Sequence, residues 1–114
     1  LWAHAGLIEP PATVARLLAD HPNVWADIAI REAEIAPGGK LAPAWRDLFL
    51  EYPDRFTIGS DTWVPSRWET YEQIIDFDRQ WLAQLPLDVA EKIAYRNAAR
   101  LFGAGPVLPQ EAGR

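Results

Sequence analysis

The chain has 114 residues, of which 49% are hydrophobic and 24% are charged, a composition that excludes wholesale disorder and fits a single globular domain. Its formal net charge is −5 and it has no basic block, so we expect neither nucleic acid nor an anionic membrane surface as a partner. No apolar run approaches the roughly 20 residues of a membrane-spanning helix. The absence of cysteine excludes disulfides and thiolate metal sites.

The sequence contains no methionine, and its first residues, Leu1–His4, resemble the interior of a structural element. We therefore expect this chain to be the C-terminal piece of a longer protein. The compartment is left open by the sequence, with a cytoplasmic location favoured.

Three short apolar segments are predicted to be strands, and each is followed by a helical pattern. The first strand precedes a helix that begins at Pro10-Pro11 and ends near Asp20. The second precedes a loop over residues 31–40 and a helix over 42–50. The third precedes a long helix that ends near Leu85. The predicted strands are Leu1–Ala5, Val24–Ile30 and Phe56–Ser60.

Two capping boxes are predicted in the C-terminal half of the chain. Ser66 with Glu69 would open the long helix, and Asp88 with Glu91 would open an additional C-terminal helix. Gly103 is predicted to end that last helix. Asn97 lies on its apolar face, and we expect its side chain to satisfy a buried backbone group.

The alternation of strands and helices predicts an α/β fold with parallel strands and right-handed crossovers. Three such units would leave both sheet edges open. They are complete only as the last three βα units of a (β/α)8 TIM barrel, followed by an extra C-terminal helix. We therefore expect residues 1–103 to form the C-terminal segment of such a barrel and residues 104–114 to be a frayed tail.

Two polar residues stand where the first and third predicted strands end. In parallel α/β folds the ligand lies at the C-terminal ends of the strands, which places His4 and Asp61 there. The period of two groups Thr57, Gly59 and Asp61 on one face of the third strand, and Asp27 is expected to point inward as well. Imidazole and carboxylate groups both bind divalent ions such as zinc and both transfer protons.

The same residues also have structural interpretations. A histidine near a strand end is often only hydrogen-bonded, and an aspartate after a strand is often a turn or helix-cap residue. Arg31, Trp63 and Arg67 are weaker candidates for contact with a substrate. A solvated loop pair is the alternative for Arg31, and a seal over the barrel rim is the alternative for Trp63. His21 is expected at the surface.

Four blocks of the sequence, taken in order, resemble the C-terminal part of the amidohydrolase-related family of metal-dependent hydrolases. The blocks are Trp2–Gly6 (WAHAG), Asn23–Ile28 (NVWADI), Pro53–Asp61 (PDRFTIGSD) and Asn97–Phe102 (NAARLF). The resemblance covers residues 1–103 and implies a TIM barrel in which the three strands are the sixth, seventh and eighth.

The resemblance also implies roles for two residues. His4 matches the sixth-strand histidine, which binds a second metal or contacts the substrate or the hydrolytic water. Asp61 matches the eighth-strand aspartate, which binds the metal and accepts a proton from the attacking water. The first-strand His-x-His pair, the fourth-strand ligand and the fifth-strand histidine of the family have no counterpart in this sequence, so the metal site is incomplete in this chain.

The resemblance implies a fragment of a metal-dependent hydrolase, acting on an amide, ester or lactone-type bond of a small-molecule substrate with a divalent metal, zinc being favoured. This chain alone would be inactive. A metal-dependent decarboxylase of the same family and a catalytically inert partial barrel are the alternatives. The expected partners are the remainder of the barrel and, through the open edges, another copy of the chain.

Overall fold

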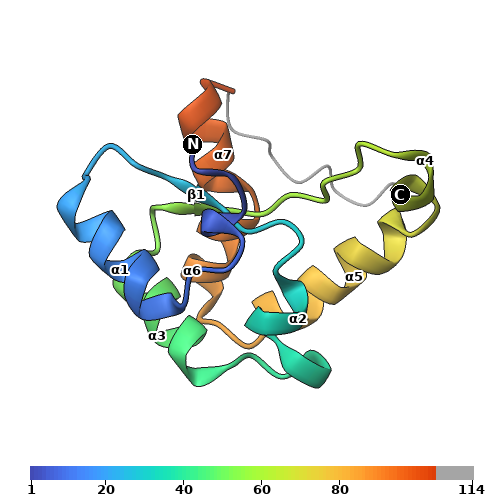
Figure 1. The fold of residues 1–114 in the computed structure, drawn as a ribbon, viewed down its shortest axis with the longest axis horizontal. Helices are drawn as coiled ribbons and strands as arrows, with labels where there is room; N and C mark the ends of the chain where they lie inside the picture. The colour runs from blue at the N-terminus through green and yellow to red at the C-terminus, as the bar shows by residue number, and fades with distance from the viewer. Residues whose placement is uncertain (105–114) are drawn as a thin grey trace, which may run out of the picture.

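The computed structural model describes residues 1–104, which form an α/β arrangement that is mostly helical (Figure 1). The predicted tail falls outside the described residues except for Ala104. Within residues 1–104 no helix is long and apolar enough to cross a membrane. The helices are α1 (Pro11–Asp20), α2 (Glu32–Ile35), α3 (Pro43–Glu51), α4 (Pro65–Glu69), α5 (Tyr71–Leu82), α6 (Leu87–Glu91) and α7 (Asn97–Phe102).

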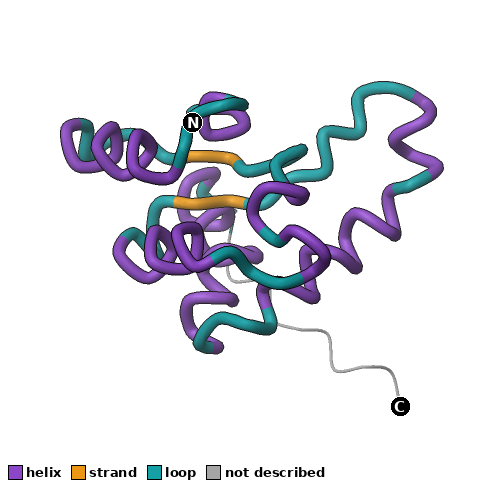
Figure 2. The backbone as a smooth tube through the Cα atoms, turned by 60° about the horizontal axis from the view of Figure 1, so that its bottom comes forward, coloured by secondary structure: helices purple, strands orange, loops and turns teal. Residues whose placement is uncertain are grey.

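Three segments pair in parallel and in chain order, as predicted. Strand β1 (Ala26–Asp27) pairs with β2 (Phe56–Thr57), in a register that places Asp27 opposite Thr57. Trp2 forms a parallel bridge to Ala26 on the other side of β1. Figure 2 shows the two strands side by side, with helical segments around them.

The extended segments are shorter than predicted, and the assignment of a strand to Leu1–Ala5 is wrong beyond Trp2. The chain turns into a 3-10 helix, η1 (Ala3–Gly6), in which His4 and Ala5 adopt left-handed backbone angles, with φ of 56° and 44°. A left-handed residue cannot continue a strand, since the extended region requires negative φ. The pairing therefore ends where His4 begins the turn.

An aromatic cluster packs the outer face of β2 against two helices. Phe56 meets Phe49 of α3 edge to face at a centroid distance of 5.0 Å, and Trp81 of α5 stacks on Phe49 at 5.3 Å. All three side chains are buried. Phe56 of the third predicted strand therefore points to the helix layer, away from the face of Thr57 and Gly59. Burying rings of this size supplies much of the apolar stabilisation.

Two side chains fasten the helices to the strands by binding backbone carbonyls. Asn97 donates from Nδ2 to the carbonyls of Pro53 and Phe56, at 2.8 and 2.9 Å, which confirms its predicted role. Arg55 donates to the carbonyls of Val24 and His21, which precede β1. These bonds satisfy carbonyl groups that the short strands leave without partners.

The two helices predicted in the second half of the chain begin differently than expected, and the long one is interrupted. The long helix is divided at Thr70, whose hydroxyl bonds the carbonyl of Arg67, because such side chains compete with the helical backbone. Helix α4 begins at Pro65 and α6 at Leu87, each without a side-chain cap bond, so neither capping box forms.

The remaining elements are compared with the sequence predictions in chain order. Residues 31–40 contain α2 and a 3-10 turn, η2 (Pro37–Gly39), instead of an irregular loop. A π-helical segment, Lys92–Arg96, joins α6 to α7. Gly103 ends α7 in the left-handed conformation, as predicted.

Asp78 of α5 is a buried acid within this helix layer. Its carboxylate accepts a hydrogen bond from the Trp81 indole N–H at 2.9 Å. Burial raises the pKa of Asp78 from 3.8 to about 6, against the opposing effect of that bond, and the negative charges of Glu32 and Asp27 add to the rise. A neutral Asp78 is therefore favoured by folding.

We predict that this group makes the protein less stable as the pH rises from about 4 to about 6. The folded state keeps the proton that the unfolded chain has already lost, so the contribution is complete below the unfolded pKa and is lost above the folded one. The substitution Asp78→Asn keeps the acceptor for Trp81 and removes the charge. Thermal melting should show it to be stabilised by about 1–2 kcal/mol at pH 8 and nearly unchanged at pH 4. Equal effects at both pH values would contradict the assignment.

Candidate functional site

The C-terminal ends of the three paired segments meet at one edge, and the backbone there is unusually bent. Five non-glycine residues of the described chain have positive φ, and all five follow one of these segments. They are His4, Ala5 and Leu7 after the first, Ile30 after β1, and Asp61 after β2, at the start of the loop that leads to α4. Left-handed angles cost free energy for such residues and gather at functional sites, which makes this edge the candidate site.

His4 lies at the centre of this edge, with its imidazole oriented by the β1–α2 loop. Its Nδ1 lies 3.0 Å from the carbonyl oxygen of Ala29. Because a carbonyl can only accept, Nδ1 carries the hydrogen in the neutral ring. The Nε2 lone pair is then free, and it faces Oδ1 of Asp61 at 3.9 Å. The two groups thus border one space. Each can accept a hydrogen bond or a proton from a water there, or bind a cation.

Asp27, on β1, lies on the Nδ1 side of the His4 ring. Its Oδ1 lies 3.6 Å from Nδ1 of His4 and accepts the backbone N–H of Ala29 at 3.1 Å. Burial raises the pKa of Asp27 above 3.8, although the backbone N–H groups of Ala29 and His4 oppose this shift. The inward orientation expected from the sequence is confirmed: Asp27 lies beside His4, and the charge of Asp61 is near enough to add to the rise of the Asp27 pKa.

Asp61 is held by an arginine from the following helix. Arg67 of α4 donates from Nη2 to the carbonyl of Ser60 at 2.6 Å and from Nε to that of Asp61 at 3.0 Å. These contacts hold the backbone of the turn after β2. They do not involve the Asp61 carboxylate, which faces His4. The side chain of Trp63, in the same loop, is 77% exposed and makes no seal within the described chain. Contact of Arg67 or Trp63 with a substrate stays a prediction.

Arg31 is not the solvated loop residue of the simpler interpretation, since only 1% of it is exposed. Its guanidinium binds the carbonyls of Ala5 and Glu9 and the carboxylate of Glu34. It also lies over the ring of Trp45, 4.8 Å from the centroid. Every contact of Arg31 is internal, so its position gives no support to direct contact with a substrate.

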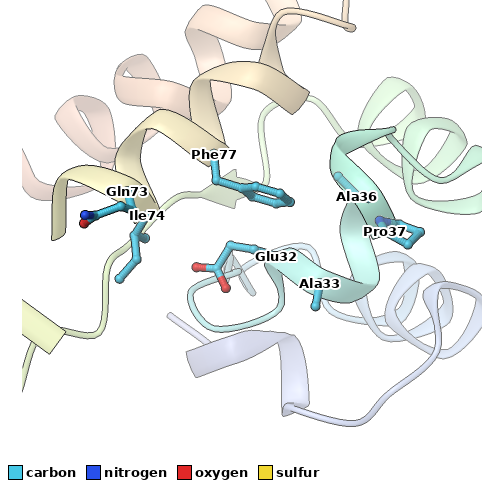
Figure 3. A pocket seen from close by; sticks show the side chains of 8 residues that line it. Glu32, Ala33, Ala36, Pro37, Gln73, Ile74 and Phe77 are labelled. Atoms are coloured by element: carbon cyan, nitrogen blue, oxygen red, sulfur yellow. The ribbon is translucent and has the colours of Figure 1, made fainter. Parts of the chain in front are cut away.

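A separate cavity of about 580 Å³ lies between α2 and α5 (Figure 3). Its walls are largely apolar, and Phe77 and Glu32 point into it from the two helices. Glu32 also accepts the backbone N–H of Ile30, which ties the cavity wall to the bent segment after β1. The lining includes neither His4, Asp27 nor Asp61, so the cavity is distinct from the polar edge.

The donor chemistry at the polar edge suits a divalent cation only in part. His4 Nε2 and the Asp61 carboxylate are ligand-type groups that face one another. Within residues 1–104, however, no group of three or more histidine, aspartate or glutamate side chains is arranged to hold a metal ion. The described residues therefore provide two candidate ligands and not a complete metal centre.

The comparison with known families decides the relationship. The model of the amidohydrolase family matches residues 1–104. The chain belongs to the amidohydrolase family. Neither a curated protein nor a solved structure gives a significant match to the chain. The family is one of TIM-barrel enzymes that are generally hydrolytic and typically metal-dependent. The membership expected from the four sequence blocks is thereby confirmed.

Two features of the amidohydrolase segment were not predicted from the sequence. One is the internal role of Arg31. The spacing of Arg31 and Glu34 suits a helical ion pair, and this signal could have replaced the predicted loop with a turn of helix. The other is the left-handed backbone at His4 and Asp61. Histidine and aspartate are enriched among non-glycine residues with positive φ, but most of them lie in ordinary extended or helical structure, so residue type alone does not locate such a turn.

Gly59 is required by the close approach of Asp27. A Cβ atom at residue 59 would lie 2.6 Å from Oδ2 of Asp27 and 3.4 Å from the Cβ of Ala29. We predict that Gly59→Ala lowers the unfolding free energy by about 1–3 kcal/mol, since the carboxylate must move. In the Asp27→Ala background the same substitution should cost much less, as a thermal-melting double-mutant cycle would reveal. Additive effects would show that the two residues do not compete for this space.

Proposed function

We propose that this segment supplies the proton-transferring side of a hydrolase active site, cleaving an amide, ester or lactone-type bond of a small molecule. The observation that carries the proposal is the facing pair of His4 Nε2 and the Asp61 carboxylate, 3.9 Å apart, at the ends of parallel strands. Membership of the amidohydrolase family supports the same reaction class. We propose that the three βα units are the last three of a TIM barrel.

Asp61 is assigned the role of proton acceptor. A water held between the Asp61 carboxylate and Nε2 of His4 can give a proton to the carboxylate, which acts as a general base. Arg67 fixes the Asp61 backbone through the Ser60 and Asp61 carbonyls, so the carboxylate keeps its direction toward that water. The proton can then pass to the leaving group of the substrate.

His4 is assigned the role of orienting the water. The bond from its Nδ1 to the Ala29 carbonyl selects the tautomer in which Nε2 accepts a hydrogen bond. A water that donates one hydrogen to Nε2 and the other to Asp61 presents its oxygen lone pair to the substrate. The two side chains are about a quarter exposed, which leaves room for solvent and substrate to reach them.

A divalent metal, with zinc favoured, completes the proposed centre. Asp61 would be one of its ligands through one carboxylate oxygen, and the other oxygen would stay available for the proton. His4 would be a ligand only where a second ion takes the place of the water at Nε2, and the remaining ligands would come from outside the described residues. When bound, such an ion lowers the pKa of a water and stabilises negative charge on a carbonyl oxygen.

The substitution Asp61→Asn tests the proton-acceptor role in the full-length protein. It keeps the size of the side chain and removes its basicity, so we expect turnover to fall on the order of 10²–10⁴-fold. Hydrolysis of an aryl ester and of an anilide provides the rate, and metal content is measured in parallel. A fall in rate with metal retained supports proton transfer. A joint fall in rate and metal content indicates that Asp61 is chiefly a ligand.

The matched control is Asp20→Asn, at an exposed position on the last turn of α1. It removes the same charge far from the polar edge and should leave turnover unchanged. Near-normal turnover of the Asp61 variant would reduce Asp61 to a turn residue and would remove the catalytic interpretation of this segment.

The open sheet edges support a second proposal, that this segment pairs with further strands. Within the described chain, the backbone groups of Leu1 on one edge and Ile58 on the other have no backbone partner. Asn97 already occupies the Phe56 carbonyl, so a strand beside β2 would pair from Ile58 onward. The remainder of the barrel is the proposed partner, and a second copy is its substitute.

We predict that the 114-residue chain alone self-associates or melts at a low temperature. The substitution Leu1→Lys places a charge on the exposed edge and should shift the chain toward the monomer in light scattering. Leu87→Lys, at a similarly exposed leucine of α6, is the control and should not. A monodisperse, cooperatively melting wild-type monomer with a high melting temperature would contradict the prediction.

A further inference from the structure

Arg31 is a charged side chain in a place where an apolar one would be expected. It is 1% exposed, its Nε has no hydrogen-bond partner, and its partner carboxylate on Glu34 is 54% exposed. Taking a guanidinium out of water with an incomplete set of partners is unfavourable, and apolar residues of similar volume often replace buried ion pairs without loss of stability. The side chain therefore calls for an explanation other than stability.

The contacts of Arg31 converge on the turn that carries His4. Nη1 donates to the carbonyl of Ala5 at 3.0 Å, and Nη2 donates to that of Glu9 at 2.7 Å. Ala5 follows His4 directly, and both have left-handed backbone angles. The guanidinium plane is itself held by Trp45 on one side and by Glu34 at its end. The planar guanidinium thus binds the strained turn at Ala5 and the segment that follows it at Glu9.

The same two segments are joined a second time by His4 itself. The imidazole Nδ1 bonds the carbonyl of Ala29, two residues before Arg31 in the chain. The Arg31 bond to Ala5 runs in the opposite direction, from the β1–α2 loop to the turn. Each bond lowers the entropic cost of the other, since both close the same pair of segments. Loosening the arginine should therefore release the imidazole.

We propose that Arg31 is a positioning residue for His4: it clamps the η1 turn so that the Nδ1–H tautomer is selected and Nε2 stays directed at Asp61. The proposal rests on the proposed function for its catalytic meaning, but the clamp itself is a property of this chain. It assigns to Arg31 an indirect role in place of contact with a substrate.

The test uses the full chain labelled with ¹⁵N-histidine, since His4 and His21 are its only histidines. Long-range ¹H–¹⁵N spectra at mildly alkaline pH, where free histidine is neutral, report the tautomer of each ring. Wild type should give the Nδ1–H pattern for His4. The variant Arg31→Met should remain folded and shift His4 to the Nε2–H form that neutral histidine prefers in water. His21 is the internal reference and should not change.

The matched control is Arg55→Met, which removes a second arginine that binds backbone carbonyls at the opposite end of the strands. It should leave the His4 pattern of the wild type intact and alter at most the signals of His21. A change at His4 in this variant as large as that in Arg31→Met would reduce the effect to general loosening and would overturn the proposal.

Arg31→Lys provides a second variant in case the methionine variant does not fold. Lysine keeps the charge but cannot hold both carbonyls in one plane, so a mixture of His4 tautomers is expected. A wild-type His4 pattern in a folded Arg31 variant, or an Nε2–H pattern in the wild type, overturns the proposal. Because these spectra require no turnover, an absence of hydrolase activity would refute the proposed function and leave the clamp standing.

Discussion

The parallel pairing of three short backbone segments is the interaction on which the rest of this structure depends. Trp2, β1 and β2 contribute only a few hydrogen bonds, yet their common direction brings all three C-terminal ends to one edge. The register then determines the neighbours. With Asp27 opposite Thr57, the Asp27 carboxylate lies over residue 59, and only glycine leaves it that space. The polar edge is thus built from pairs that the sheet geometry places together.

So few strand bonds do not hold three segments in place unaided, and the helix layer supplies the rest. Phe49 lies between Phe56 and Trp81, so one ring connects α3, β2 and α5. Asn97 and Arg55 add directed bonds to strand carbonyls at two places. Apolar burial provides the larger free energy, while the polar bonds specify which carbonyl each helix approaches. The consequence is a rigid support beneath an edge whose own backbone is strained.

The strained backbone at this edge is held by arginine contacts. His4 and Asp61 both have left-handed backbone angles. Arg31 binds the carbonyl of Ala5, which follows His4, and Arg67 binds the carbonyl of Asp61 itself. Arginine suits this purpose because its planar fork binds two carbonyls in fixed directions. The free-energy cost of the two left-handed residues is offset by these contacts, which hold each of them in one backbone conformation.

Much of the outline followed from the sequence alone. The alternation of apolar segments and helical patterns predicted the α/β class, and the order of four blocks predicted the amidohydrolase family. The position of His4 and Asp61 after two strands predicted their meeting, because parallel strands share one ligand-facing end. The period of two also predicted the inward side of Asp27, and the apolar helix face predicted the buried bond of Asn97. These features depend on spacing, which a sequence records directly.

Other features were decided only by the tertiary structure. The strands are shorter than predicted, and the first predicted strand is largely a turn. The backbone angles at His4 depend on contacts with Ala29 and Arg31, which lie far away in the sequence. The break at Thr70 and the unused capping boxes reflect local competition for the same backbone groups, in which several outcomes have similar free energies. Arg31 was expected at the surface, since charged residues usually are. It is buried because the carbonyls of Ala5 and Glu9 and the ring of Trp45 converge on one point, and only the folded chain brings them together.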